Sequence, residues 1–178
     1  AAVEAATGGE LLAIPHNGNL SNGRMFTVET FDGKPLTKEL ATLRARFEPL
    51  IEATQIKGDS ESHPFLSPND EFAGYEIWDR SNLNGTELKK KEMLQWEYAR
   101  SALKTGLQLE RRLGVNPFKF GMIGATDTHT GLSTVDDDNF FGKFPLYEPN
   151  PGRALHQSRG NEELGLGYKG WRYSSSGM

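Results

Sequence analysis

The sequence predicts a loop-rich α/β domain. Short apolar runs typical of buried strands alternate with longer stretches in which apolar residues recur every three or four positions, as in an amphipathic helix. A polar loop follows each predicted strand, and parallel α/β folds place their functional residues at that position. The 178 residues, of which 36% are hydrophobic, suffice for a single domain with its own core.

Two helices and two strands are predicted in the first third of the chain. A helix end at residues 1–6 is followed by an apolar run at residues 11–14, which predicts a buried strand. Alternating apolar and polar residues predict another strand over residues 51–56. Between them, residues 36–47 predict a helix that Thr37 can cap. Its predicted buried face consists of Leu36, Leu40, Leu43 and Phe47.

The longest predicted helix spans residues 89–113 and ends at Gly114, with Pro117 shortly after it. A third strand is predicted over residues 120–126, and residues 132–178 are predicted to be loop. The predicted buried face of the long helix consists of Met93, Trp96, Ala99, Leu103 and Leu107.

Composition and missing motifs exclude several classes of protein. The chain has no Cys, which rules out disulfide frameworks, iron–sulfur clusters and thiol catalysis. Its formal net charge of -4 argues against a general nucleic-acid binder. No apolar run approaches the roughly 20 residues that a membrane-spanning helix needs. Walker, dinucleotide-binding and Gly-x-Ser-x-Gly motifs do not occur, so nucleotide-cofactor and serine-hydrolase chemistry are not supported.

Two of the predicted strands are followed at once by side chains that can bind a metal. His16 follows the first strand, and Asp127 and His129 follow the third with one residue between them. Positions i and i+2 of an extended segment point the same way, so this pair can aim an oxygen and a nitrogen at one point. Such ligands suit Mn, Zn, Fe or Mg. The alternatives are that His16, like His156, is a surface residue and that Asp127 caps a helix.

Other polar side chains are candidates for substrate binding. Glu61 and His63 form a further i, i+2 pair after a predicted strand, with a solvated loop as the alternative. Arg24 and Lys57 can hold a phosphate or carboxylate group, or can be surface residues. The acidic run at residues 136–138 lacks the glycine and glutamate of an EF-hand loop, which favours a solvated turn over a calcium site.

Five runs of sequence carry a resemblance to a known family, at residues 14–26, 55–64, 72–78, 98–107 and 124–131. They include Gln55-Ile-Lys-Gly-Asp-Ser-Glu-Ser-His-Pro64 and Gly124-Ala-Thr-Asp-Thr-His-Thr-Gly131. On these runs the chain resembles the DUF3604 family, a family of uncharacterised proteins in the PHP (polymerase and histidinol phosphatase) superfamily. The resemblance covers nearly the whole chain.

The resemblance implies a distorted (β/α) barrel whose active site holds divalent metal ions at the carboxyl ends of the strands. It also implies hydrolysis of a phosphoester, with metal-bound hydroxide attacking phosphorus. His16, Asp127 and His129 match the later metal-ligand motifs of the superfamily. We therefore expect Asp127 and His129 to be catalytic as well, with Mn, Zn or Fe as the cofactor and a small anionic molecule as the substrate.

The superfamily's opening His-x-His motif does not occur in this sequence. We therefore expect residues 1–178 to be one domain that is an incomplete, interior or carboxyl-side portion of a larger PHP-like barrel. The expected function is that of a metal-dependent hydrolase, most simply a phosphoesterase, of which this chain carries the later ligand motifs. No feature of the sequence indicates an oligomeric state or a compartment. The alternative function is a non-catalytic, metal-stabilised or ligand-binding domain.

Overall fold

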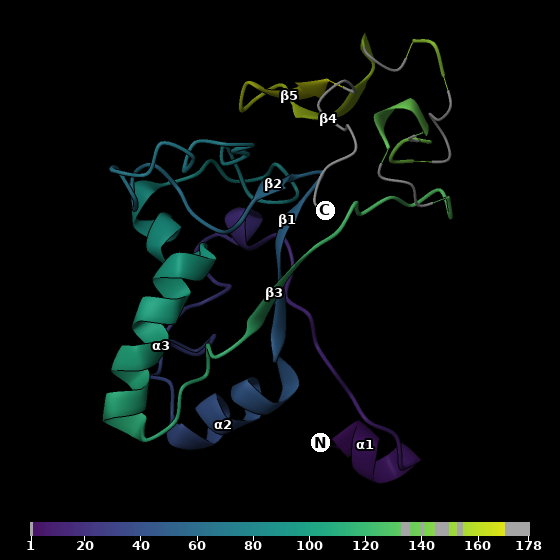
Figure 1. Ribbon diagram of the computed structural model, residues 1–178. Helices are drawn as coiled ribbons and strands as arrows, with labels where there is room; N and C mark the ends of the chain where they lie inside the picture. The colour runs from purple at the N-terminus through teal and green to yellow at the C-terminus, as the bar shows by residue number, and fades with distance from the viewer. Residues whose placement is uncertain (1, 133–135, 140, 145–149, 153–154, 170–178) are drawn as a thin grey trace.

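The structure is a computed structural model, and it describes residues 2–132, 136–139, 141–144, 150–152 and 155–169. It confirms the predicted α/β class, because a small open sheet of three strands is accompanied by a few helices and long irregular loops (Figure 1). Within these residues, no helix has both the length and the apolar character needed to cross a membrane.

The three-stranded sheet is built around β1 (Leu50–Gln55). The short strand β2 (Gly58–Asp59) follows a tight turn and pairs with β1 antiparallel, whereas β3 (Gly121–Gly124) pairs with β1 parallel. The strands predicted at residues 51–56 and 120–126 are thereby confirmed. Because β1 and β3 run in parallel, their carboxyl ends lie at the same edge of the sheet, where α/β folds collect their functional residues.

Three α-helices lie within the described residues: α1 (Ala2–Thr7), α2 (Lys38–Phe47) and α3 (Ala99–Leu113). The predicted cap of α2 is confirmed, because the Thr37 hydroxyl oxygen accepts a hydrogen bond from a backbone N–H of the first turn at 3.3 Å. Gly114 ends α3 in the left-handed conformation, with φ of 75°, which glycine adopts at little cost. In Figure 1, α3 flanks the sheet on the left and α2 lies below it.

The helix predicted over residues 89–113 begins too early. Its first part forms the separate 3₁₀ helix η2 (Lys91–Trp96), and Tyr98 is extended, with φ of -112° and ψ of 138°. The interruption follows from Glu97, whose fully buried side chain is held by the ammonium group of Lys89. A buried carboxylate must be paired, and this tertiary contact outweighs the helical pattern of the local sequence. The other 3₁₀ helices described are η1 (Gly18–Leu20) and η3 (Asp137–Asn139).

The buried faces of α2 and α3 differ from the predicted ones. On α2, Leu40 and Leu43 are 40% and 43% exposed, whereas Ala41 is fully buried. On α3, Leu107 is 61% exposed. Small residues allow a helix backbone to approach its neighbour closely, and here that approach decides which face turns inward. The buried residues of α3 are Ala99, Ala102, Gly106 and Leu109.

The strand predicted at residues 11–14 is wrong. The large apolar side chains of this run are between 38% and 56% exposed. Single backbone hydrogen bonds attach the segment to its surroundings, from Ala13 N to Phe47 O at 2.7 Å and from Glu52 N to Pro15 O at 2.9 Å. A strand needs a continuous ladder with a neighbour, and the described residues provide none for this run.

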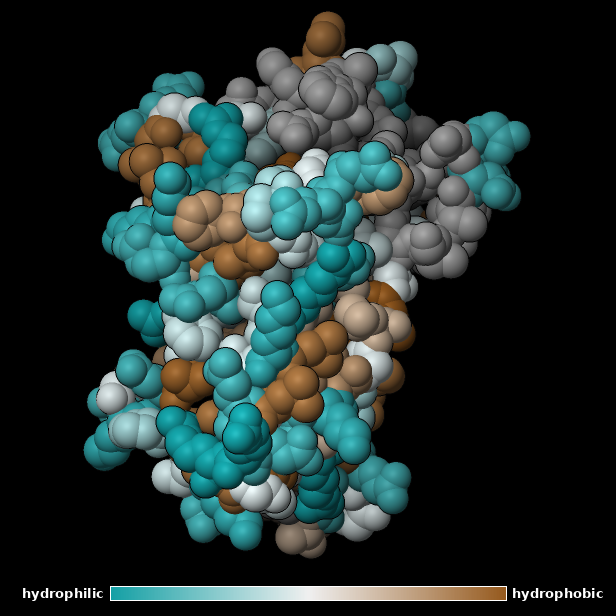
Figure 2. Space-filling view, turned by 60° about the vertical axis from the view of Figure 1, so that its left-hand side comes forward, coloured by the Kyte–Doolittle hydropathy of each residue, from teal (hydrophilic) through white to brown (hydrophobic). Residues whose placement is uncertain are grey.

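The main core lies between α3, α2 and β1. Phe26 and Phe118 meet edge to face in it, with ring centroids 5.6 Å apart. On the face shown in Figure 2, hydrophobic residues form separate patches among hydrophilic ones. The buried members of this core are Phe26, Leu36, Ala41, Ile51, Ala99, Ala102, Leu109 and Phe118.

A hairpin of β4 (Gln157–Asn161) and β5 (Leu166–Lys169) lies in the part of the chain that was predicted to be loop. The prediction was wrong there because each strand is short and rich in polar residues and glycine. The hairpin is joined to the rest of the fold by Tyr168, which stacks on Trp78 with a centroid separation of 4.1 Å. This contact belongs to a second, smaller core of Leu20, Ile56, Trp78 and Tyr168.

The close packing of α3 predicts that Gly106→Ala destabilises the protein, although alanine is the better helix former. A Cβ atom at this position would collide with the Asn116 side-chain oxygen and lie 3.1 Å from Phe118 Cβ. Asn116 cannot move away freely, because its oxygen accepts a hydrogen bond from Phe118 N at 2.9 Å. Urea unfolding should show a loss of about 1–2 kcal/mol in the unfolding free energy.

The control for this prediction is Gln108→Ala, at an exposed position of the same helix. It should leave the unfolding free energy nearly unchanged. Equal or higher stability of the Gly106→Ala protein would contradict the close approach of α3 to residues 116–118.

Candidate functional site

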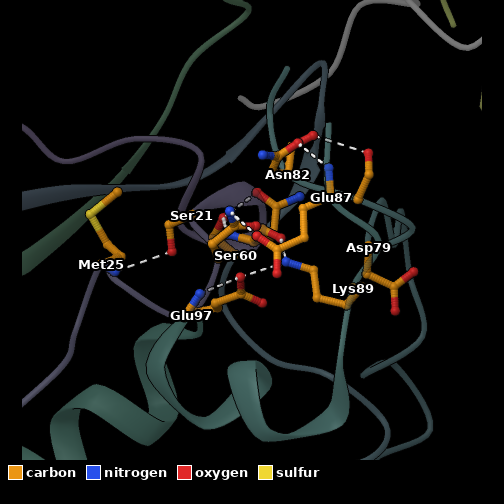
Figure 3. A network of polar contacts seen from close by, with 12 residues as sticks. Ser21, Met25, Ser60, Asp79, Asn82, Glu87, Lys89 and Glu97 are labelled. Carbon is orange, nitrogen blue, oxygen red and sulfur yellow. Dashed lines mark hydrogen bonds and ion pairs between the residues drawn. The ribbon is translucent and has the colours of Figure 1, made fainter. Parts of the chain in front are cut away.

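A buried hydrogen-bond network fixes the turn that carries Lys57. The side-chain amide of Asn19, which is fully buried, donates to the carbonyl oxygens of Lys57 at 3.0 Å and Trp78 at 2.8 Å. Ser60 Oγ donates to Asn19 Oδ1 at 2.8 Å, and Lys89 Nζ donates to Asn19 O at 2.8 Å. Figure 3 shows Ser60 and Lys89 among these contacts. Buried polar groups that are satisfied in this way hold their backbone rigidly.

The carboxylate of Asp127 lies between two buried ammonium groups. Lys57, from the β1–β2 turn, and Lys143, from residues 141–144, both form ion pairs with Asp127 Oδ2. Gln55 Nε2 donates to the same oxygen at 3.1 Å. The two lysines are only 6% and 1% exposed, and a buried charge needs an opposite charge nearby, which this carboxylate provides. Asp127 also adopts φ of 53°, a region that residues with a side chain seldom occupy.

The imidazole of His129 completes this cluster. Its Nε2 lies 3.1 Å from Asp127 Oδ1 and 3.2 Å from Lys143 Nζ. The backbone N–H of His129 donates to the carbonyl oxygen of Lys143 at 2.9 Å, and the rings of His129 and Phe144 meet edge to face. The side chains of Asp127 and His129 therefore contact each other, although Asp127 is not in the extended conformation on which the prediction from their spacing relied. The His129 side chain is 55% exposed, so solvent or a ligand can reach it.

A second acidic group, Glu52 in the middle of β1, lies within electrostatic range of the same two lysines. Its Oε2 is buried and has no hydrogen-bond partner among the described residues. Burial raises the pKa of Glu52, and the charges of His16, Lys57 and Lys143 partly offset this rise, as does a hydrogen bond from Gln55. His16 itself is exposed. The two lysines thus act on both carboxylates, which makes Asp127 and Glu52 parts of one charged site.

The predicted metal ligands are only partly brought together. Asp127 and His129 are in contact, whereas His16 interacts with Glu52. In the described part of the chain, no three side chains of His, Asp or Glu converge closely enough to hold a metal ion. The ammonium groups of Lys57 and Lys143 form ion pairs with the Asp127 carboxylate and so occupy the position at which a metal cation would bind it.

Arg24 and Glu61, two of the predicted substrate-binding residues, make their contacts elsewhere. The guanidinium group of Arg24 lies over the ring of Phe31, 5.9 Å from its centroid. Glu61 pairs with Arg100 on the surface, with Arg100 Nη2 at 2.7 Å from Glu61 Oε1. The structure gives neither side chain a contact with Asp127, so among the predicted substrate-binding residues it is Lys57 that lies in the cluster.

The side chain of His63 is held by contacts at both of its ring nitrogens. Its Nε2 lies 2.8 Å from Asp79 Oδ2, and its Nδ1 accepts a hydrogen bond from the backbone N–H of Phe65 at 3.0 Å. Because Nδ1 is an acceptor, the ring proton lies on Nε2 and both nitrogens are engaged. His156 is exposed, as predicted, and residues 136–138 fall in and next to the short helix η3.

Three residues of the site were missed from the sequence: Glu52, Gln55 and Lys143. Glu52 and Gln55 lie in a run that was interpreted only as a strand, although a polar residue inside an alternating strand can face a site at the strand end. Lys143 has no such signal, because it is an isolated lysine in a loop region. Its place beside Asp127 depends on how the chain returns after β3.

The comparison with known families matches the chain from end to end. Residues 1–178 match the family described as "Protein of unknown function (DUF3604)". The chain belongs to the DUF3604 family. No curated protein and no solved structure matches it. The family resemblance noted at five runs of the sequence is thereby confirmed over the whole DUF3604 chain.

The shared carboxylate predicts that Asp127→Asn strongly destabilises this DUF3604 protein. Asparagine has nearly the same shape and tolerates the positive φ, so the change removes mainly the charge. It removes the carboxylate charge with which both buried lysines form ion pairs, which should lower the unfolding free energy by about 3–5 kcal/mol in urea unfolding.

A surface ion pair provides the control for Asp127→Asn. Asp32 pairs with Lys34 at 2.6 Å, and both side chains are largely exposed. Asp32→Asn should therefore change the stability little. The interpretation of Asp127 is wrong if the two variants unfold at the same denaturant concentration.

The raised pKa of Glu52 predicts the opposite effect for Glu52→Gln. A carboxyl group with a raised pKa favours the folded state while protonated, so stability is lost as the pH rises from the ordinary value of 4.5 through the raised one. In chelator-treated protein, Glu52→Gln should be more stable than the unmodified protein at neutral pH. The gain should vanish at a pH well below 4.5, where both side chains are neutral.

Urea unfolding at the two pH values measures this difference, with Glu10→Gln at an exposed position as the matched control. A Glu52→Gln protein that is less stable at neutral pH would show that neighbouring cations already compensate the carboxylate.

Proposed function

We propose that this DUF3604 protein is part of a metal-dependent hydrolase of the PHP type, and that it acts on a phosphoester of a small molecule. The sheet of β1 and β3 would then belong to a distorted (β/α) barrel. In such barrels the catalytic residues lie at the carboxyl ends of parallel strands. Fold and family suggest the reaction class, and the residues at the strand ends must provide its chemistry.

The proposal rests above all on the contact between Asp127 and His129. The two side chains meet at 3.1 Å just after β3, beside the ammonium groups of Lys57 and Lys143. An oxygen and a nitrogen donor with adjacent positive charge match what phosphoester hydrolysis requires, namely a metal ligand pair and a group that binds the anion.

The donor chemistry of the site fits a hard or borderline divalent cation such as Mn, Zn or Fe. Asp127 and His129 would hold it, and His16 and Glu52, which interact with each other, are the candidates for further donors. The Glu52 oxygen that lacks a hydrogen-bond partner among the described residues supports this fit, because such an atom is costly to bury unless something binds it. A cation bound there would lower the pKa of a water ligand to about 7 and so supply a hydroxide nucleophile.

The lysines of the site would bind the substrate. When a phosphate group enters, the ammonium groups of Lys57 and Lys143 can exchange the Asp127 carboxylate for phosphate oxygens. Their burial strengthens this attraction, because the field of a charge is screened less away from water. Gln55 would keep Asp127 in place during the exchange, since it donates to the same carboxylate oxygen.

A second function, a non-catalytic domain that binds an anionic ligand, is favoured by one observation. Lys57 and Lys143 already neutralise Asp127, so the site is a stable arrangement of charges by itself. A small anion could bind to the two lysines with no chemical step. Turnover of a phosphoester separates the two functions.

Metal analysis tests the leading proposal. Protein purified without chelator should carry about one Mn, Zn or Fe ion per chain by elemental analysis. It should also hydrolyse para-nitrophenyl phosphate in the presence of that metal. His129→Ala should lose both the metal and the activity, because it removes the nitrogen donor that contacts Asp127.

His156→Ala is the matched control, since it removes an exposed histidine outside the cluster. It should keep the metal and the activity. A folded protein that binds none of the three metals and hydrolyses no phosphoester when they are supplied would overturn the proposal that this chain holds the metal ion and would leave the binding domain.

A further inference from the structure

The ammonium group of Lys143 touches both of the residues that the proposed function assigns to a metal ion. Its Nζ forms an ion pair with Asp127 Oδ2, donates to the backbone carbonyl oxygen of the same residue, and lies 3.2 Å from His129 Nε2. Oxygen and nitrogen atoms of these kinds are the donors that a hard or borderline divalent cation prefers. A buried cation of the chain itself therefore lies among the atoms proposed to bind the metal ion.

His129 Nε2 faces two groups to which it cannot hydrogen-bond at the same time. It lies 3.1 Å from Asp127 Oδ1 and 3.2 Å from the ammonium group of Lys143. An imidazole nitrogen carries either a proton, which it can donate to the carboxylate, or a lone pair, which can accept from the ammonium group. In either case one of these two contacts has no hydrogen bond. A divalent cation has no such conflict, because the nitrogen and the carboxylate can both bind it through lone pairs.

The side chain of Lys143 can leave this position without a change in its backbone. The backbone is attached independently, because His129 N donates to Lys143 O at 2.9 Å and Thr128 Oγ1 donates to Gly142 O at 2.7 Å. The ammonium group of a lysine is carried by a flexible stem of four carbons. Rotation of this stem withdraws the ammonium group and leaves both of these hydrogen bonds intact.

Asp127 keeps a positive partner when Lys143 withdraws. Lys57 also pairs with Asp127 Oδ2, and Gln55 Nε2 donates to the same oxygen at 3.1 Å. The carboxylate is therefore still compensated, as a partly buried charge must be. Exchange of the Lys143 ammonium group for another cation is consequently compatible with the rest of the charged cluster.

We propose that Lys143 is a displaceable counter-ion, which occupies the metal position until a divalent cation takes its place. This inference rests on the proposed function for the metal site, and it goes further by giving that site a competitor within the chain. Without metal, the ammonium group holds Asp127 and His129 together. When a divalent cation binds these two residues, Lys143 turns away from them. Lys143 thus lowers the metal affinity of the site and preserves its arrangement in the metal-free protein.

Metal binding by Lys143→Met tests the competition. The substitution removes the ammonium group and keeps an unbranched side chain. Chelator-treated Lys143→Met should bind Mn²⁺ at least about tenfold more tightly than the unmodified chain, because a charge this close shifts the affinity for another cation, the proton, by about 10- to 1,000-fold. Titration calorimetry with Mn²⁺ alone measures both affinities. Lys104→Met, which removes an exposed positive charge from α3, is the matched control and should bind Mn²⁺ like the unmodified chain.

Amine labelling follows the displacement in the unmodified chain and does not depend on the folding of a variant. Acetic anhydride would be added to chelator-treated protein with and without saturating Mn²⁺, and mass spectrometry of peptides would measure acetylation at each lysine. Lys143 is 1% exposed, so it should react slowly without metal and faster with Mn²⁺ bound. Lys34, whose side chain is largely exposed, should react at the same rate in both conditions and serves as the reference.

Each failure has a distinct meaning. Equal or weaker Mn²⁺ binding by Lys143→Met, or acetylation of Lys143 at a rate that Mn²⁺ does not change, overturns the displacement. That result leaves the hydrolase proposal standing if the unmodified chain binds Mn²⁺ and hydrolyses para-nitrophenyl phosphate. If neither the unmodified chain nor Lys143→Met binds Mn²⁺, both proposals fail. Tighter binding by Lys143→Met and faster acetylation with Mn²⁺, but without hydrolysis of any phosphoester, would support the displacement and overturn the hydrolase.

Discussion

The pairing of two buried lysines with one carboxylate is the constraint on which the site depends. Lys57 comes from the turn after β1, Asp127 follows β3, and Lys143 lies beyond it in the chain. A buried ammonium group without a counter-charge would cost several kcal/mol, so the three segments must meet at this point. The parallel pairing of β1 with β3 brings the first two together, and the carboxylate then holds the third.

The site contains two energetically unfavourable features of a kind that is common in functional regions. Glu52 is buried with one oxygen unpartnered among the described residues, and Asp127 adopts a backbone conformation that few residues tolerate. Both features lower stability, and proteins retain such features where function requires them. In the proposed function, an incoming anion would replace Asp127 as the partner of the two lysines.

The irregular region between β2 and η2 serves the site through its polar network. Asn19 binds the backbone of Lys57 and Trp78, and Lys89 joins Asn19 to the buried Glu97. A loop with few elements of secondary structure is thereby held in place by side chains. The turn that carries Lys57 is consequently held in a fixed position beside Asp127.

The sequence by itself determined the α/β class, the strands β1 and β3 and the cap of α2, because each depends on neighbours within a few residues. Only the tertiary structure decided the rest. The exposed run at residues 11–14 has a strand-like pattern but lacks a ladder partner, and α3 turns Gly106 inward because of its contact with residues 116–118. Lys143 reaches Asp127 because of the path that the chain takes after β3. Burial and charge pairing act between residues that lie far apart in the sequence, so no local pattern reveals them.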